Sequence, residues 1–465
     1  MCGDPYLELI QALHLRRSGA IGAATAATRA RPIMAGPLLA AALVAAAQAT
    51  VHHVASAALN PEAQEGTSSI TLYSDPFELR YGEVYMSADY EQRALPPEVV
   101  ERYAGARRMA VTSWTPDLVR RHADGSETSV PLSEVYNHHA KFHLVDDGFE
   151  RGIGTGADYR GTLEVYQAPF RAVFDHPRAW SYFAHLINLR RPASVALAAS
   201  AGSERTFDPL SQCPCTPQRR FNFTSGTIDG EAPDPPFYPC EGQMLEERNP
   251  TCTLQTYRGG VRCCAHGMFV TDTGRVCRAP TCTALPVDVV HFKVTVTYED
   301  FDAAVHRELL PTPMEMSGTG VHGEFDVRPC AAGTPPSACL GTHTFVHTIA
   351  APAGVNGTHF RVHSALSHVH SGALSISLQR AGTNETICRN AVDGGGMLYG
   401  TGTEAGNEVG YVVGLTPCAW GEDDAPVLTV GEPMRVTAVY NASRYQYGVM
   451  ATWKLRLFVD DDARD

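Results

Sequence analysis

Short runs in which apolar and polar residues alternate dominate the sequence, and long stretches with helical periodicity are scarce. Residues 70–73 and 289–298 are clear examples, rich in Val, Thr, Tyr and Phe. Successive side chains of a strand point to opposite faces, so this period of two predicts half-buried β-strands. Gly, Pro and Asp separate the runs, which is typical of β-sandwiches and jelly rolls. We therefore predict an all-β protein.

The chain of 465 residues is long enough for two or three domains of roughly 100–200 residues. We predict two consecutive jelly-roll β-sandwich domains, at residues 65–285 and 286–460. The boundary is placed near Pro286 because clean alternation resumes there. Residues 213–282 hold eight cysteines and many prolines, and we predict that they form an irregular insert in the first domain.

Residues 1–49 have the pattern of a signal peptide with an upstream extension. Four arginines precede the apolar run 37–47, which ends in the small-x-small pattern Ala47-Gln48-Ala49. Met34 is an alternative start to Met1. The apolar run is short for a membrane span, although an uncleaved signal anchor is the alternative. We therefore expect a secreted or lumenal protein with no membrane contact beyond its export signal.

The cysteines fit an exported protein. There are 13, and Cys2 precedes the apolar run, which leaves an even number in the mature chain. An even number after an export signal indicates disulfides. Closeness in sequence suggests the pairs Cys330–Cys339 and Cys388–Cys418, although the complete connectivity does not follow from the sequence.

Two further patterns concern metal binding and glycosylation. The alternative to disulfides in the insert is a zinc site, although its spacing matches no standard zinc finger; its ligands would be Cys213, Cys215, Cys263, Cys264 and His266. Four glycosylation sequons also follow the export signal; they begin at Asn222, Asn356, Asn384 and Asn441.

The net charge of −13 bears on the class of partner. Nucleic acids and anionic membrane surfaces attract basic patches, so this charge argues against both. We expect a small-molecule or peptide partner. The oligomeric state does not follow from the sequence.

The pair His368 and His370 is the first candidate for metal chemistry. It precedes an alternating run at residues 373–378, and side chains two apart on a strand share one face. Two imidazoles would therefore converge on one ion. Met450 precedes another alternating run, and a thioether beside two imidazoles suits copper. The competing interpretation is a solvated strand face with a packed methionine.

A second group of histidines lies earlier in the chain. His138 and His139 are adjacent, so on a regular strand their side chains would point to opposite faces. They can bind one ion only at a strand end or a β-bulge, where the alternation breaks. His143 is offset further and is a less certain partner. His185 lies in an apolar, strand-like run, where a hydrogen-bonded core histidine is the competing interpretation.

The order of these residues resembles that of the type II copper, ascorbate-dependent monooxygenases, which include peptidylglycine α-hydroxylating and dopamine β-monooxygenase. The local sequence around these residues is more similar to that of the stress up-regulated Nod 19 family. The similar stretches are GIGTG at 152–156, GGVRCC at 259–264, SHVHSGA at 367–373, EAGNEVGYVVG at 404–414 and GVM at 448–450.

The resemblance implies two jelly-roll domains that each hold one copper ion. By this match, His138, His139 and His185 would bind the electron-donating copper. His368, His370 and Met450 would bind the copper that activates O₂, and these three would be the catalytic ligands. Ascorbate would reduce both ions, and a C–H bond of the substrate would be hydroxylated.

The chain departs from the monooxygenase pattern at two positions. Ala140 stands where those enzymes usually carry a methionine, and Leu366 stands where the peptide-hydroxylating members place an arginine. We therefore expect a copper monooxygenase whose substrate is a small molecule or a modified peptide. The alternatives are a non-catalytic extracellular copper-binding or stress-response protein with the same fold, and a structural module whose histidines line polar interiors.

Overall fold

The computed structural model describes residues 66–87, 92–146, 149–190, 221–222, 227–228, 266, 285–311, 313–317, 323–352 and 357–459. Almost all of their regular structure is strand, so the all-β prediction is confirmed. The expected export segment, most of the cysteine-rich insert and the proposed zinc ligands other than His266 lie outside these ranges. Among the described residues, no helix has the length and apolar character needed to cross a bilayer.

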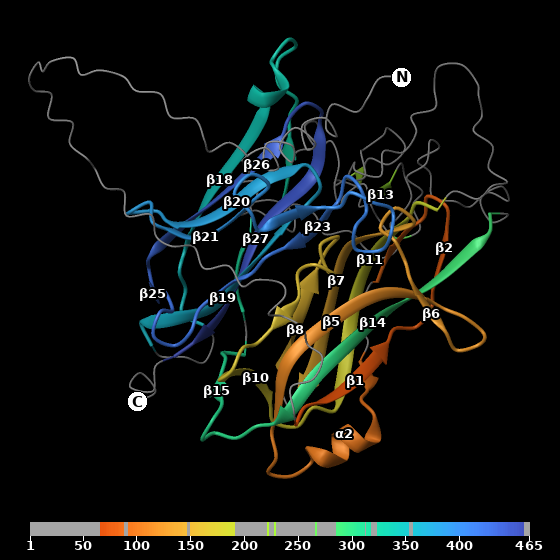
Figure 1. The fold of residues 1–465 in the computed structure, drawn as a ribbon, viewed down its shortest axis with the longest axis vertical. Coiled ribbons are helices and arrows are strands. Elements are labelled where there is room, and N and C mark those ends of the chain that lie inside the picture. Colours follow the sequence, from red (N-terminus) through yellow and green to blue (C-terminus); the bar gives the residue numbers. More distant parts are fainter. Residues whose placement is uncertain are drawn as a thin grey trace, which may run out of the picture.

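The first sandwich consists of an eight-stranded and a five-stranded sheet (Figure 1). The larger sheet contains β1 (Ser68–Tyr73), β14 (Val287–Asp300), β5 (Met109–Arg121), β10 (Phe170–Phe174), β15 (Arg307–Glu308), β2 (Phe77–Arg80), β6 (Glu127–Ser129) and β9 (Glu164–Val165). The smaller sheet contains β3 (Val84–Met86), β11 (Ala179–Asn188), β7 (Val135–Asp146), β8 (Phe149–Thr155) and β4 (Arg93–Ala94). The rings of Phe142 on β7 and Phe292 on β14 lie 5.3 Å apart between centroids, so the sheets pack face to face.

The second sandwich consists of a six-stranded and a four-stranded sheet. The first contains β16 (Met314–Ser317), β27 (Gln446–Phe458), β19 (His359–Val369), β24 (Cys418–Ala419), β17 (Glu324–Val327) and β25 (Val427–Thr429). The second contains β18 (Leu340–Thr348), β26 (Pro433–Asn441), β20 (Ala373–Arg380) and β21 (Thr386–Ala391). The phenol of Tyr440 on β26 donates a hydrogen bond to the carbonyl of Met450 on β27 at 2.5 Å, which joins these sheets.

The remaining elements are short. They are the ribbons β12 (Phe221–Asn222) with β13 (Thr227–Ile228) and β22 (Met397–Tyr399) with β23 (Val412–Leu415), the helix α2 (Pro97–Arg102), and a 3₁₀ turn at Pro336–Ala338.

Strand β14 shows the predicted alternation along its length, with buried residues at every second position from Val290 to Tyr298. It pairs with β1 and β5 of the first sandwich over most of its residues. The predicted domain boundary at residue 286 is therefore too early, because the segment after it completes the first sandwich. The strands of the second sandwich begin with β16.

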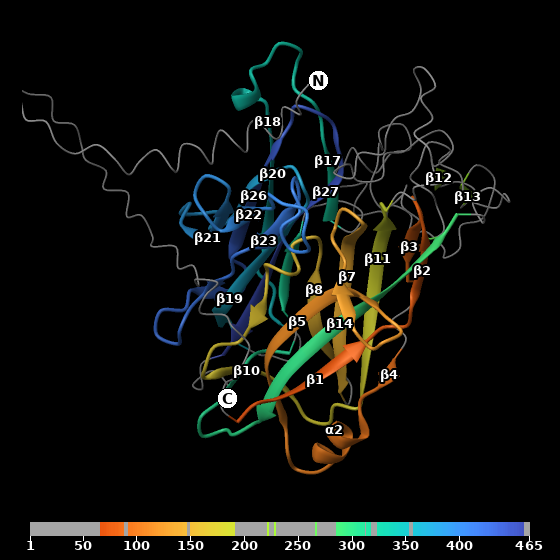
Figure 2. The ribbon, with the colours of Figure 1, turned by 45° about the vertical axis from the view of Figure 1, so that its right-hand side comes forward.

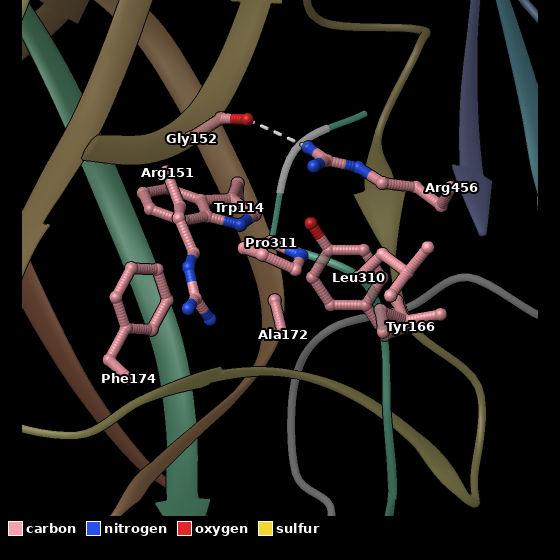
Figure 3. Close-up of a pocket in the computed structure, with 10 residues that line it drawn as sticks. Trp114, Arg151, Gly152, Tyr166, Ala172, Phe174, Leu310, Pro311 and Arg456 are labelled. Atoms are coloured by element: carbon pink, nitrogen blue, oxygen red, sulfur yellow. Dashed lines mark hydrogen bonds between the residues drawn. The ribbon is translucent and has the colours of Figure 1, made fainter. Parts of the chain in front are cut away.

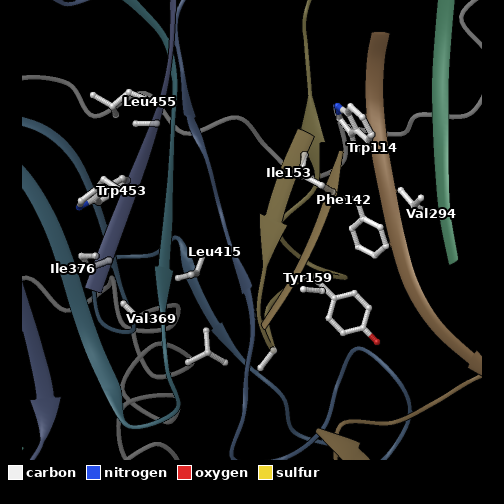
Figure 4. Close-up of a cluster of buried hydrophobic side chains, with 14 of the residues drawn as sticks. Trp114, Phe142, Ile153, Tyr159, Val294, Val369, Ile376, Leu415, Trp453 and Leu455 are labelled. Carbon is white, nitrogen blue, oxygen red and sulfur yellow. The ribbon is translucent and has the colours of Figure 1, made fainter. Parts of the chain in front are cut away.

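The buried apolar side chains of the two sandwiches belong to one cluster (Figure 4). Trp114, Phe142 and Val294 lie on one side of this view, and Trp453 and Leu455 lie on the other. All five side chains are at most 1% exposed. Burial of this extent on one face of each sheet is what the alternating pattern requires.

Two of the expected covalent links are present. Cys330 pairs with Cys339, and Cys388 pairs with Cys418, so both predicted disulfides are confirmed. Such bonds are consistent with an oxidising, secretory compartment. Two of the sequons are described fully enough to compare. Asn384 is exposed in the turn between β20 and β21, whereas Asn441 is only 2% exposed.

The smaller sheet of the first sandwich faces the second sandwich, so β7 and β8 lie next to β19 (Figure 2). Apolar contacts hold this interface, because the rings of Phe170 and Phe458 lie 4.7 Å apart and those of Tyr136 and Tyr411 lie 5.5 Å apart. The Lys454 ammonium on β27 also donates a hydrogen bond to the Gly154 carbonyl on β8 at 3.1 Å. The histidine-bearing strands therefore meet at the interface.

Candidate metal site

The first group of histidines lies at an irregular point of the smaller sheet. Strand β7 pairs His139 with His185 of β11, and the next pair is Asn137 with Leu186. His138 is therefore the extra residue of a β-bulge. A bulge breaks the alternation, so consecutive side chains can turn toward the same region. The ring centroids of His138 and His139 lie 4.3 Å apart, and those of His138 and His185 lie 4.4 Å apart. The bulge predicted as one alternative for this pair is confirmed.

The second group lies at the end of β19. His368 is its penultimate residue, and His370 follows directly after the strand. Their ring centroids lie 5.2 Å apart, so the two imidazoles converge as the spacing predicted. Gly372 then adopts a φ of 99°, and the Ala373 amide donates to the His370 carbonyl at 3.2 Å. This tight turn into β20 fixes the position of the pair.

The two groups meet in one place. The ring centroid of His370 lies 4.9 Å from that of His138 and 5.2 Å from that of His139. The ring centroid of His368 lies 5.4 Å from that of His139. We call the five residues the histidine cluster; its members are His138, His139, His185, His368 and His370. The resemblance implied one ion in each domain, whereas here all five imidazoles gather between the sandwiches.

The backbone of Met450 lies in the same region, next to that of His370. Strand β27 pairs Ala451 with Val369, so the same register continued by one residue sets Met450 opposite His370. The phenol of Tyr440 accepts a hydrogen bond from the His370 amide at 3.1 Å and donates to the Met450 carbonyl. The buried tyrosine therefore ties together the backbones of two predicted ligands. Sequence reasoning did not single out Tyr440.

Burial favours the neutral imidazole at two members of the cluster, His139 and His370. The pKa values of His139 and His370 lie well below the usual 6.5, first because burial penalises the charged form and then because other histidines stand nearby. A neutral imidazole keeps a lone pair on one ring nitrogen at neutral pH. These side chains can therefore donate to a metal ion without first losing a proton.

Three members of the cluster have ring nitrogens close enough together to share one metal ion. One ring nitrogen from each of His138, His139 and His370 lies within 4.8 Å of the other two. His138 and His370 are at most 1% exposed. Imidazole ligands suit Zn, Cu, Fe and Ni, so these three side chains could hold an ion of any of these elements.

The structure also shows the surroundings of Ala140 and Leu366, the two positions at which the sequence departs from the monooxygenase pattern. Ala140 follows the histidine pair, is 1% exposed and is part of the apolar interior. Leu366 lies two residues before His368 and is 9% exposed. It lines a pocket with Glu164 and Ser364. The residue that the resemblance aligns with an arginine is thus apolar here.

A second pocket lies along the interface, away from the histidines (Figure 3). Its lining includes Trp114, Arg151, Tyr166, Phe174, Pro311 and Arg456. No member of the histidine cluster lines either of these two pockets.

Two solved vicilin structures resemble the chain weakly. The crystal structure of vicilin from Solanum lycopersicum (tomato) is 9% identical over 81% of this chain and 83% of that chain, with a TM-score of 0.11. Vicilin from Solanum melongena is 8% identical over 82% and 83%, with a TM-score of 0.10. At TM-scores this low, the similarity does not establish a shared fold.

The comparison with curated proteins finds no match. A family model does match, over the segment that contains β14 and all strands of the second sandwich. The match includes the pair His368 and His370 as well as Met450. The similarity to this family noted from the sequence is confirmed for this segment: residues 243–459 match the model of the family Stress up-regulated Nod 19.

Proposed function

We propose that this is an exported protein that binds copper at the histidine cluster. The observation that carries the proposal is the convergence of five imidazoles from both sandwiches at one buried place. A transition-metal ion can bind several converging imidazole nitrogens at once.

The methionine favours copper over zinc. Thioether ligands are soft and select Cu(I) among the ions available to a protein. Met450 lies beside His370 in the register of β27 and β19, and its carbonyl shares the Tyr440 hydroxyl with the His370 amide. We expect its sulfur to join the nitrogen ligands.

We expect His370→Ala to abolish tight copper binding by the full-length protein. This imidazole is one of the three whose ring nitrogens lie within 4.8 Å of one another. The loss of affinity should exceed the roughly 10- to 100-fold that follows loss of an outer hydrogen-bond partner. Titration with Cu(I) under ascorbate, against a chromophoric chelator, measures the affinity, and elemental analysis gives the stoichiometry.

The matched control is His359→Ala. His359 lies on the same strand, β19, but is exposed and hydrogen-bonds the Thr429 hydroxyl at 3.2 Å. This variant should bind copper as the unaltered protein does. Equal affinities for both variants, or an unaltered protein that takes up no copper, would refute the proposal.

A second candidate function is ascorbate-dependent hydroxylation of a C–H bond with O₂. The order of the ligands and the placement of Met450 beside His370 favour it. Copper bound there would supply the electron transfer and oxygen chemistry. The test is oxygen consumption by the copper-loaded protein with ascorbate, compared with Met450→Ala. If neither consumes oxygen, the protein is a non-catalytic copper-binding protein, and the family match then supports a role in stress responses.

A further inference from the structure

Residues 156–162, which follow β8, form a loop of the first sandwich that packs against the second. At its start, the Gly156 carbonyl accepts a hydrogen bond from the Asn137 amide group at 2.9 Å, next to the bulge residue His138. A side chain at Gly156 would overlap the imidazole of His368. The glycine that ends the motif at 152–156 is therefore required for this close approach.

Asp158 lies in this loop and contacts the histidine cluster from outside. Its Oδ1 lies 3.1 Å from the Nδ1 of His368, and its side chain is only 3% exposed. A carboxylate accepts hydrogen bonds, so the shared proton belongs to Nδ1. The opposite nitrogen, Nε2, is buried and has no hydrogen-bond partner among the described residues. The imidazole thus presents a lone pair on the side away from Asp158.

Other contacts hold the loop in place across the interface. The Thr162 hydroxyl accepts a hydrogen bond from the Leu415 amide at 2.8 Å. The Arg160 guanidinium lies 3.5 Å from a carboxylate oxygen of Glu408, which is 1% exposed. Because Glu408 and Leu415 both lie in the segment between β21 and β24 of the second sandwich, these contacts tie the loop to that sandwich. Asp158 is therefore preorganised rather than drawn in by a ligand.

We propose that Asp158 is a positioning residue that orients His368 of the opposite sandwich as a metal ligand. This rests on the proposed copper binding and adds a dependence of the site on the packing of the two sandwiches. A carboxylate that accepts the outer proton of a ligating imidazole fixes its tautomer and raises its basicity. The class of ligand is a soft or borderline transition-metal ion, and copper is the probe.

Replacement of Asp158 should weaken copper binding without removing a ligand. We expect Asp158→Ala to lower the affinity by about 10- to 100-fold, the usual loss for such an outer partner. Asp158→Asn keeps the shape of the side chain, and its amide oxygen can still accept the hydrogen bond from His368. The copper affinity of this variant should therefore lie between those of the unaltered protein and Asp158→Ala. Both variants should change the hyperfine coupling of bound Cu(II) in electron paramagnetic resonance, which a purely structural effect would leave unaltered.

Thr162→Val is the matched control on the same loop. It removes the hydrogen bond to Leu415 but leaves the Arg160–Glu408 contact that also holds the loop, and it does not touch His368. Copper affinity and the resonance spectrum should therefore match those of the unaltered protein. A loss equal to that of Asp158→Ala would overturn the role of Asp158 in favour of the loop as a whole. Unaltered affinity and spectrum in both Asp158 variants would also overturn it, while copper binding itself stood. An unaltered protein that binds no copper overturns both proposals.

Discussion

Arg456→Met is expected to lower the free energy of unfolding by about 3–5 kcal/mol, the usual cost of removing one partner of a buried ion pair. Arg456 on β27 pairs with Glu164 on β9, and their side chains are 5% and 8% exposed. The guanidinium also donates to the Gly152 carbonyl at 2.7 Å, which is drawn as the dashed line in Figure 3. Without it, the Glu164 carboxylate keeps the hydrogen bond from the Tyr166 hydroxyl at 2.7 Å but loses its ion-pair partner.

The double variant Arg456→Met with Glu164→Gln is the control. It removes both charges, so the desolvation of an uncompensated carboxylate no longer contributes. Buried pairs replaced by neutral residues often cost little, and the double variant should therefore be more stable than the single one. Urea denaturation at pH 7 measures all three proteins. If the double variant were less stable than Arg456→Met, Glu164 would not be the source of the cost.

Acid is expected to destabilise the metal-free protein below pH 6.5, partly through two histidines outside the cluster. Burial lowers the pKa of His143 and of His363 to about 4. The His363 ring packs 4.3 Å from that of Phe170, between centroids, and hydrogen-bonds the Trp420 carbonyl at 3.2 Å. In the unfolded chain, each imidazole titrates at the ordinary pKa of about 6.5.

The sign follows from proton uptake. Between pH 6.5 and pH 4 the unfolded chain binds these protons and the folded protein does not, so stability falls as the pH falls. Each group contributes about 1.4 kcal/mol per pH unit, or about 3 kcal/mol over the whole window for a fully buried histidine. Partial exposure makes the contribution of His143 smaller. Above pH 6.5 both forms are neutral and the effect vanishes.

The comparison that isolates this effect is His363→Gln, which cannot titrate but can still donate to the Trp420 carbonyl. Urea denaturation in the presence of a chelator, at pH 7 and pH 5.5, should show that the variant loses about 1 kcal/mol less than the unaltered protein. His359→Gln, on the same strand but exposed, should leave the loss unchanged. If all three proteins lost the same amount of stability between pH 7 and pH 5.5, His363 would not titrate in this window.

The sequence predicted strands more reliably than their partners. The alternation along β14 identified it as a strand, because the period depends only on which residues face the interior. Its partner β5 lies more than 160 residues earlier in the chain, and nothing within β14 indicates this. Assignment of the strand to the first sandwich therefore needed the structure, and the boundary at residue 286 was wrong for that reason.

The candidate site shows the same division between local and distant information. The spacing of His368 and His370 and the need for a bulge at His138 follow from the geometry of one strand. The meeting of the two groups depends on how the sandwiches pack, which no single strand encodes. Asp158 was missed because a lone acidic residue in a loop has no distinctive pattern, although the glycine motif directly before it was noted.

The bulge in β7 also makes this strand sensitive to the deletion of a residue at one position. It absorbs exactly one additional residue at His138, between the pairs formed by Asn137 and His139. Loss of a residue there would restore a regular strand, whose side chains alternate strictly. The segments on either side could then keep their present orientation only by shifting register against β11. Natural variants of this protein should therefore tolerate substitutions near this point far better than single-residue deletions.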